Sequence, residues 1–285
     1  MINNDNSVLT TLAVKFWSGY KYDKSASLKT IEDNHMERGA GNFNKKLLPK
    51  FALKDIKDVI TQFKYYFTEN TLPYNALLGT RILPTSGFME FQRTIIVSQN
   101  MLKKAVREFI DEYGTSKETA KQMLGDLYNI NDYPDVDAVA KRFDIIVNFF
   151  PVPEANRFNT SITNTQVKRL NDQLESMSLE AKFDLVNRTE KIARALMHTL
   201  MNDGKRIYNS TVINNVNKLS EQLRTLNYDN DSLLIEVKEM VDNNILNIRI
   251  DYLKESPAYR TKVILKTQNV IDLVDEINES ISDTI

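Results

Sequence analysis

Few residues in this chain have the types and spacing that catalysis requires. The 285 residues include two histidines and no cysteine, which removes thiol nucleophiles, disulfides and thiolate zinc sites. His35 lies near Glu32, Asp33 and Glu37, a grouping that could bind a metal ion but is also common in solvated loops. His198 falls within a helical pattern, where packing or solvation explains it better than a role as a base. We find no catalytic constellation and predict no enzymatic activity, no metal and no cofactor.

Phosphate-binding motifs are also missing. Neither GxxxxGK[ST] nor GxGxxG occurs in the chain. Segment 37–46, ERGAGNFNKK, combines two glycines with three basic residues, Arg38, Lys45 and Lys46, and could in principle surround a phosphate. A solvated loop explains the same residues, and we prefer that interpretation.

The stretch LAVKFWSGYKY, residues 12–22, contains four aromatic rings, among them the only tryptophan, interleaved with lysines. Interleaved rings and lysines are typical of surfaces that bind single-stranded nucleic acid. The alternation of Leu12, Val14 and Phe16 is instead typical of a strand with one buried face. We expect these three in the core, and Trp17 buried under a covering helix in preference to exposed. The candidate contact surface consists of Trp17, Tyr20, Lys21, Tyr22, Arg38, Lys45 and Lys46.

A second strand should position this stretch. In RFDIIVNFFPVP, residues 142–153, the apolar residues Phe143, Ile145, Val147 and Phe149 alternate before two prolines. With helices between them, the two strands would pair in one small sheet. The chain from 24 to 49 has no regular period and is expected to be irregular.

Helical spacing appears between the two strands. One apolar stripe runs from Leu53 to Phe67, and Pro73 should end that helix. A punctuated connection at 77–91 leads into a long helix over 89–113. A shorter helix is expected over 116–128, with TSKE as its N-terminal cap.

Beyond residue 165 the chain contains a single proline and a single glycine, and its apolar residues follow helical spacing. Two stretches step by alternating fours and threes, as in the heptads of a coiled coil. Such short stretches suit a helical bundle, or a stalk that pairs with itself or with another chain. The candidate helix-association residues are Val212, Val216, Leu219, Leu223 and Leu226, then Val263, Val270, Val274, Ile277 and Ile281.

The predicted fold is mainly α. An α+β domain with a small sheet should span 8–158, and an all-helical bundle or coiled-coil-like region should span 165–285. Charge is unevenly distributed along the chain: residues 12–50 hold eight Lys or Arg against four Asp or Glu, and residues 229–285 hold six against twelve. This polarity could steer a partner.

The order of landmarks resembles a family of bacterial and bacteriophage proteins catalogued as a domain of unknown function. The landmarks are FWSGYK, then GTRIL at 79–83, AVREFIDEY at 105–113 and RFDIIVNFFPVP, and the resemblance covers about residues 8–158. The EFIDEYG segment lacks the arginine that the family has before its aromatic residue. The resemblance implies an accessory or adaptor role beside MoxR-type AAA+ ATPases and their von Willebrand A-domain partners. It supplies no catalytic residues.

We therefore predict a non-enzymatic helical interaction or adaptor protein of phage or bacterial origin. Its partners would be other proteins, including an AAA+ ATPase or a second copy of itself. The alternatives are a nucleic-acid-binding protein that uses the aromatic and basic N-terminal surface, and a structural component of a virion. The N-terminus lacks a secretory signal and no apolar run approaches a transmembrane length, so we expect a cytoplasmic location, in the bacterial host if the protein is phage-encoded, and no contact with a membrane.

Overall fold

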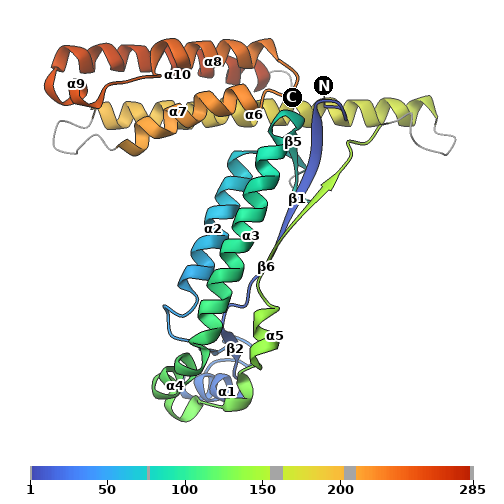
Figure 1. Cartoon of the computed structure of the whole chain (residues 1–285), viewed down its shortest axis with the longest axis vertical. Helices are drawn as coiled ribbons and strands as arrows, with labels where there is room; N and C mark the ends of the chain where they lie inside the picture. The colour runs from blue at the N-terminus through green and yellow to red at the C-terminus, as the bar shows by residue number, and fades with distance from the viewer. Residues whose placement is uncertain (1, 76–77, 155–162, 202–209, 283–285) are drawn as a thin grey trace. The chain divides into compact units, whose positions relative to one another are not determined.

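The structure is a computed structural model that describes residues 2–75, 78–154, 163–201 and 210–282 (Figure 1). It is mainly helical with a small antiparallel sheet, as predicted. The strands are β1 (Ser7–Lys15), β2 (Tyr20–Tyr22), β3 (Asn44–Lys46), β4 (Leu72–Asn75), β5 (Thr80–Pro84) and β6 (Asp144–Phe150). The helices are α1 (Lys24–Asp33), α2 (Lys54–Glu69), α3 (Phe88–Asp111), α4 (Tyr113–Leu124), α5 (Val136–Ala140), α6 (Asn164–Met201), α7 (Ser210–Thr225), α8 (Ser232–Asn244), α9 (Ile250–Glu255) and α10 (Pro257–Ser282), with 3-10 turns η1 (Thr85–Gly87), η2 (Gly125–Leu127) and η3 (Ile130–Asp132).

The chain divides into two compact units, each described here by itself. The first, which we call the bundle unit, comprises Met1–Thr11, Phe67–Phe91 and Asn148–Ile285. The second, the ribbon unit, comprises Leu12–Tyr66 and Gln92–Val147. The boundary predicted between 158 and 165 falls inside the bundle unit, because the segments that carry β4 and β5 group with the C-terminal helices.

A four-stranded sheet has the order β4-β5-β1-β6. The predicted pairing of the two apolar strands is confirmed, since β1 and β6 are neighbours. The sequence did not predict β4 and β5, which fall where a helix end and a connection were expected. Both are short and carry proline, and β5 pairs antiparallel with β1 from Ser7↔Pro84 to Thr11↔Thr80. Their partners along the sheet, more than their local pattern, make them strands.

In the bundle unit, α6 packs against α7 and α10, and α8 packs against α7 and α10 (Figure 1). The heptad residues lie on the faces between these helices. Leu219 and Val274 are each 0% exposed, and Val212 is half-buried at the edge of the same core. The side chain of Ile281 lies outside the described residues. The stripes therefore pack against helices of the same chain, which the sequence could not distinguish from pairing between chains.

Arginines hold the C-terminal end of α2 within the bundle unit. The Arg188 guanidinium of α6 donates hydrogen bonds to the carbonyl oxygens of Glu69 at 2.9 Å and Thr68 at 3.0 Å. Arg81 of β5 donates to the Thr71 carbonyl at 2.8 Å. Carbonyl groups at a helix end lack partners within the helix, and cations near them are stabilising. These arginines therefore join α6 and β5 to the C-terminal end of α2.

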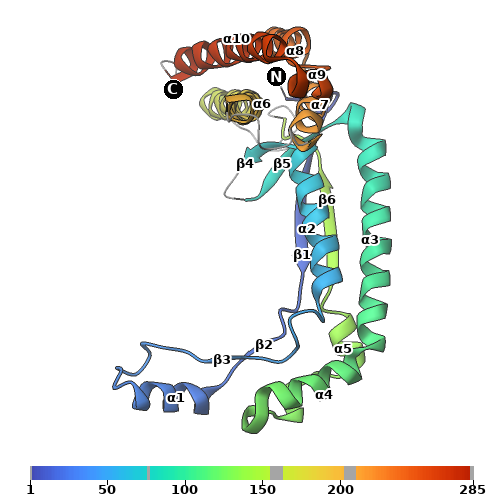
Figure 2. The same cartoon turned by 90° about the vertical axis from the view of Figure 1, so that its left-hand side faces the viewer.

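The ribbon unit contains a two-stranded sheet, β2-β3, with α1 alongside it (Figure 2). The prediction of an irregular segment over 24–49 is wrong for α1 and β3. Helix α1 was not predicted because it buries only Ser27 and Ile31, which are too few residues to give a periodic apolar pattern. Its start is nevertheless well defined, since Asp23 Oδ1 accepts a hydrogen bond from the Ala26 amide at 3.0 Å.

The expected burial of Phe16 is wrong, while that of Trp17 agrees with the structure. Strand β1 ends at Lys15, so the alternation stops before either ring. Phe16 is 40% exposed and Trp17 is 8% exposed. The Trp17 ring meets Tyr113 edge to face, with centroids 6.2 Å apart, and the Arg142 guanidinium lies 5.8 Å from its centroid.

Helix boundaries in the middle of the chain are close to expectation. Helix α2 ends before Pro73, and α3 matches the helix predicted over 89–113 except that it ends at Asp111. Helix α4 begins at Tyr113, whose preceding residue makes no side-chain cap, so the predicted cap at TSKE is wrong. The buried Tyr113 side chain is 1% exposed, and its packing on Trp17 and Phe109 sets the start of α4 more strongly than a cap.

Candidate binding groove on the ribbon unit

The register of the β2-β3 ribbon divides its residues between two faces. Because side chains alternate along a strand, cross-strand partners share a face. Lys21 and Lys45 are partners on one face, and Lys45 is 5% exposed. Tyr20 and Lys46 are partners on the opposite face, which also carries Tyr22. Tyr20 is 53% exposed and Tyr22 is 50% exposed, so this second face is open.

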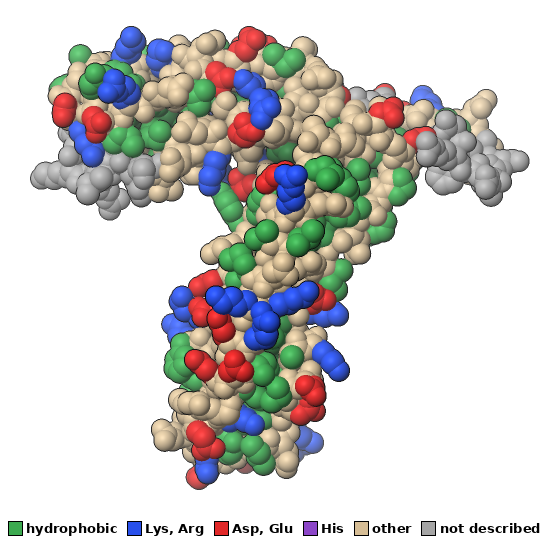
Figure 3. All heavy atoms as spheres, in the orientation of Figure 1, with side chains coloured by type: hydrophobic (Ala, Val, Ile, Leu, Met, Phe, Trp, Pro, Cys, Tyr) green, Lys and Arg blue, Asp and Glu red, His purple; other side chains and the backbone are tan. Residues whose placement is uncertain are grey.

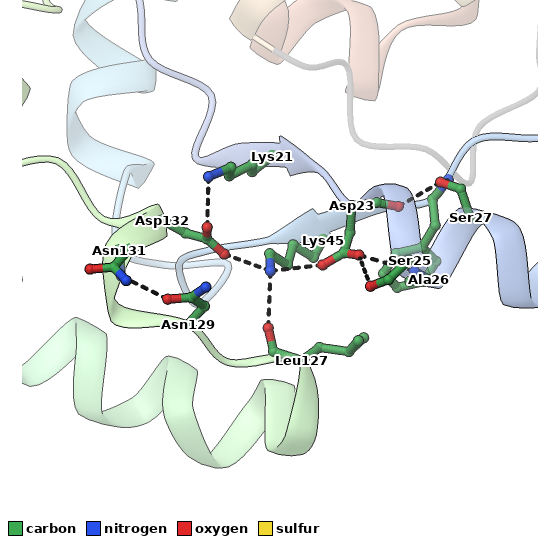
Figure 4. A network of polar contacts seen from close by, with 11 residues as sticks. Lys21, Asp23, Ser25, Ala26, Ser27, Lys45, Leu127, Asn129, Asn131 and Asp132 are labelled. Atoms are coloured by element: carbon green, nitrogen blue, oxygen red, sulfur yellow. Dashed lines mark hydrogen bonds and ion pairs between the residues drawn. The ribbon is translucent and has the colours of Figure 1, made fainter.

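The closed face of the ribbon holds a network of ion pairs (Figure 4). Lys45 Nζ lies 2.8 Å from Asp23 Oδ2 and 2.5 Å from Asp132 Oδ2, and it donates a hydrogen bond to the Leu127 carbonyl at 3.0 Å. Lys21 Nζ donates to Asp132 Oδ1 at 2.6 Å. The Lys45 and Asp132 side chains are each 6% exposed. The network joins the ribbon to the start of α1 and to the η2 and η3 turns.

The charges in this network stabilise one another. The hydrogen bond from the Ala26 amide, with those from Lys45 and Ser25, holds the pKa of Asp23 well below its usual range. Burial alone would raise the pKa of Asp132, but the ammonium groups of Lys21 and Lys45 outweigh it and lower this pKa. Burial likewise opposes the charge on Lys45, and its two carboxylate partners raise its pKa nevertheless. These shifts keep Asp23, Asp132 and Lys45 charged near neutral pH, so the network suits a structural role better than proton transfer.

The open side of the ribbon borders a groove of about 810 Å³, which we call the ribbon groove. Its rings are well exposed: Phe16 by 40%, Tyr20 by 53% and Phe51 by 64%. Its lysines come from β3, from the turn before α2 and from the first turns of α2. The lining residues are Phe16, Ser18, Tyr20, Lys46, Leu48, Pro49, Lys50, Phe51, Leu53, Lys54, Lys57 and Asp58.

Most of the positive charge in the ribbon groove is uncompensated. Lys54 pairs with Asp58 at 3.1 Å on the surface of α2. Within the described ranges, Lys46, Lys50 and Lys57 form no ion pair. Basic and acidic side chains are interspersed over the face seen in Figure 3. The three unpaired lysines are a local source of attraction for an anion.

Two local features fix the shape of the groove. Gly19 has a φ of 68° and its carbonyl accepts a hydrogen bond from the Leu47 amide at 2.7 Å. A Cβ at this position would lie 3.2 Å from the Leu48 side chain, and a positive φ is costly for residues with a Cβ. Leu47 and Leu48 are 2% and 1% exposed, so they anchor the turn that carries Lys50 and Phe51 at its surface.

The structure separates the residues of the candidate contact surface. Tyr20 and Lys46 line the ribbon groove, and Tyr22 lies on the same open face of the ribbon. Lys21 and Lys45 belong to the ion-pair network, and Trp17 is buried. Arg38 is exposed on the segment between α1 and β3, outside the groove lining.

The candidate contact surface leaves out five rings and lysines of the groove: Phe16, Lys50, Phe51, Lys54 and Lys57. The sequence does carry a signal for them. In LPKFALKDIK, residues 48–57, Ile56 is buried, which leaves Lys54 and Lys57 on the solvent side of α2. These lysines line the same groove as Tyr20 because the chain turns at Gly19. No local sequence pattern predicts this turn.

The acidic cluster around His35 gives no metal site. His35 is exposed, with a φ of 51° at the end of α1. Among the described residues, no three His, Cys, Asp or Glu side chains are grouped so that they could hold a metal ion. His198 is exposed on α6. In the same part of the chain, every helix is too short or too polar to cross a membrane.

No protein-family model, curated protein or solved structure matches this chain. The resemblance to the family of bacterial and bacteriophage proteins therefore stays a prediction.

Proposed function

We propose that this chain is a non-enzymatic protein that acts by association, and that the ribbon groove is its binding face for an anionic partner. One observation carries the proposal. The closed face of the ribbon neutralises its lysines with Asp23 and Asp132, whereas the open face leaves Lys46 without a carboxylate, beside exposed rings. A lysine without a carboxylate partner, placed in a groove with aromatic rings, is available to a ligand.

Charge and exposed apolar surface support the same proposal. The ribbon unit has 19 Lys or Arg against 15 Asp or Glu, and the rest of the chain has 18 against 23. An anionic partner would be attracted to the ribbon unit more than to the bundle unit. Exposed rings gathered in a groove are typical of binding sites, and burying them against a partner would add to the electrostatic attraction.

The helix-association residues give less support for binding a partner. Leu219, Val270 and Val274 are at most 1% exposed, because the helices of one chain already cover them. We therefore assign association to the ribbon groove and not to the heptad stripes. An adaptor role towards another protein remains part of this proposal if the partner presents an anionic surface.

Retention on immobilised heparin, a polyanion, tests the proposal. We expect the full chain to be retained at low salt, and the triple variant Lys46→Gln, Lys50→Gln, Lys57→Gln to elute at clearly lower salt. Each lysine that neutralises an anionic group contributes about 0.7 to 0.9 to the slope of log affinity against log salt. The loss should therefore grow as the salt concentration falls.

A matched variant controls for overall charge. Lys64, Lys121 and Lys141 lie in the same unit, are exposed and are outside the groove, so their triple replacement by Gln removes the same charge. We expect this control to elute close to the wild-type chain. Equal elution of the two triple variants, or no retention of the wild type at low salt, would contradict the proposal.

A further inference from the structure

We infer that the occupant of the ribbon groove is single-stranded nucleic acid. This inference rests on the proposed function and adds the chemical class of the ligand. It begins from the composition of the groove, in which three exposed rings and three uncompensated lysines occur together. The occupant must therefore present negative charge and flat apolar surface at short intervals.

A nucleotide chain meets both requirements at every residue. Its phosphates would contact Lys46, Lys50 and Lys57, and its bases would stack on the rings of Tyr20 and Phe51. Stacking of bases on aromatic side chains beside a basic track is how single-strand binders work. A run of Asp and Glu in a protein would supply the charge but no flat surface, so the rings would contribute little to binding it.

The rings also favour unpaired bases over a duplex. In a double helix the faces of the bases are stacked on one another, and only their edges are accessible in the grooves. Sequence-tolerant stacking requires bases that can splay out onto an aromatic surface. Phe16 keeps 40% of its surface exposed although it packs against Phe143 in a T-shaped arrangement, with centroids 5.8 Å apart. The ring is thus held in place without being covered.

The open face of the ribbon extends this surface beyond the groove. Tyr22 follows Tyr20 by two positions on the same face and is 50% exposed, so the two residues are about 7 Å apart along the strand backbone. Apart from the lysines, Tyr20 and Asp58, the only polar side chain in the lining is Ser18. With few groups to read base edges, the groove should tolerate most sequences.

The test is a titration of the full chain into a fluorescein-labelled oligothymidine of about 20 nucleotides, followed by anisotropy at about 50 mM salt. We expect the single strand to bind, and a mixed-sequence duplex of equal length to bind at least about tenfold more weakly. The double variant Tyr20→Ala, Phe51→Ala should lose at least about tenfold in affinity for the single strand. Its retention on heparin should not change, because its charge is the same.

The control variant is Tyr65→Ala, Tyr252→Ala, which removes two rings that are 55% and 45% exposed and lie outside the groove. It should bind the single strand like the wild type, and buried Trp17 should report an intact ribbon unit through unchanged emission in both variants. Wild-type affinity in the Tyr20→Ala, Phe51→Ala variant, or equal binding of the duplex, would overturn the inference.

A polyglutamate peptide tests the inference of a nucleic-acid ligand separately from the proposed binding of an anionic partner. If it binds as tightly as the oligonucleotide, the occupant is an acidic protein segment, and the inference is wrong although the proposed function stands. If replacing the three groove lysines leaves heparin retention unchanged, the proposed function itself fails. If the peptide binds weakly and the oligonucleotide tightly, the inference is supported.

Discussion

Replacing Lys45 with methionine should lower the free energy of unfolding by about 3 kcal/mol. The Lys45 side chain is 6% exposed and its ammonium group contacts Asp23, Asp132 and the Leu127 carbonyl. Without it, two carboxylates remain in a site that excludes most water, and an uncompensated buried charge is expensive. Lys21 offsets part of this cost at Asp132, which is why we expect the lower end of the usual range. Urea unfolding followed by Trp17 emission measures the effect in the same unit.

The neighbouring residue provides the matched control for this prediction. Lys46 differs from Lys45 by one position and lies on the opposite face of the ribbon, where it forms no ion pair in the described structure. Lys46→Met should change the free energy of unfolding by no more than about 0.5 kcal/mol. Similar losses for the two variants would show that the two faces do not differ as described.

The second large effect is expected in the bundle unit. Leu219→Ala should lower the stability of the helices by about 3 kcal/mol, because it removes a side chain that is 0% exposed and leaves a cavity. Leu265 on α10 is 63% exposed, so Leu265→Ala should cost no more than about 0.5 kcal/mol. Urea unfolding followed by far-ultraviolet circular dichroism compares the two.

The same measurement tests whether the heptad stripe that contains Leu219 packs against helices of the same chain. If so, the urea midpoint should be independent of protein concentration, because no association is linked to folding. A midpoint that rises with protein concentration in the wild type, and rises less in Leu219→Ala, would mean that the stripe joins copies of the chain.

Local periodicity explains what could be predicted of the fold. The apolar stripes of α2, α3 and α10 repeat over several turns, so each stripe indicates which face of its helix is buried. The alternation in β6 ends at two prolines, and β1 carries the matching pattern. Their pairing follows from the scarcity of other apolar strands in the chain.

The missing elements are short, and their conformation depends on distant partners. Strand β5 has consecutive buried residues, Ile82 and Leu83, which gives no alternation to detect. The ends of elements were also difficult to predict. Strand β1 stops at Lys15, so Phe16 is exposed against expectation, whereas Trp17 is buried as expected.

The aromatic and basic character of the candidate site could be predicted from the sequence, but the residues that form it could not. The composition of residues 12–22 indicates an aromatic and basic surface, yet it cannot tell Lys45 from Lys46. That distinction depends on the ribbon register and on Asp132, which contacts Lys21 across 111 residues of sequence. Pairing of distant charges is not a local property, so a sequence pattern alone does not reveal which lysines are free.

Lysine footprinting by acetylation and mass spectrometry, with and without a heparin oligosaccharide, tests the central claim most directly. If an anionic partner occupies the ribbon groove, Lys46, Lys50 and Lys57 should lose reactivity when the oligosaccharide is added. Lys64, Lys121 and Lys141 should react equally in both conditions, and Lys45 should react slowly throughout because its side chain is 6% exposed. Unchanged reactivity at the three groove lysines, with protection elsewhere on the chain, would contradict the account.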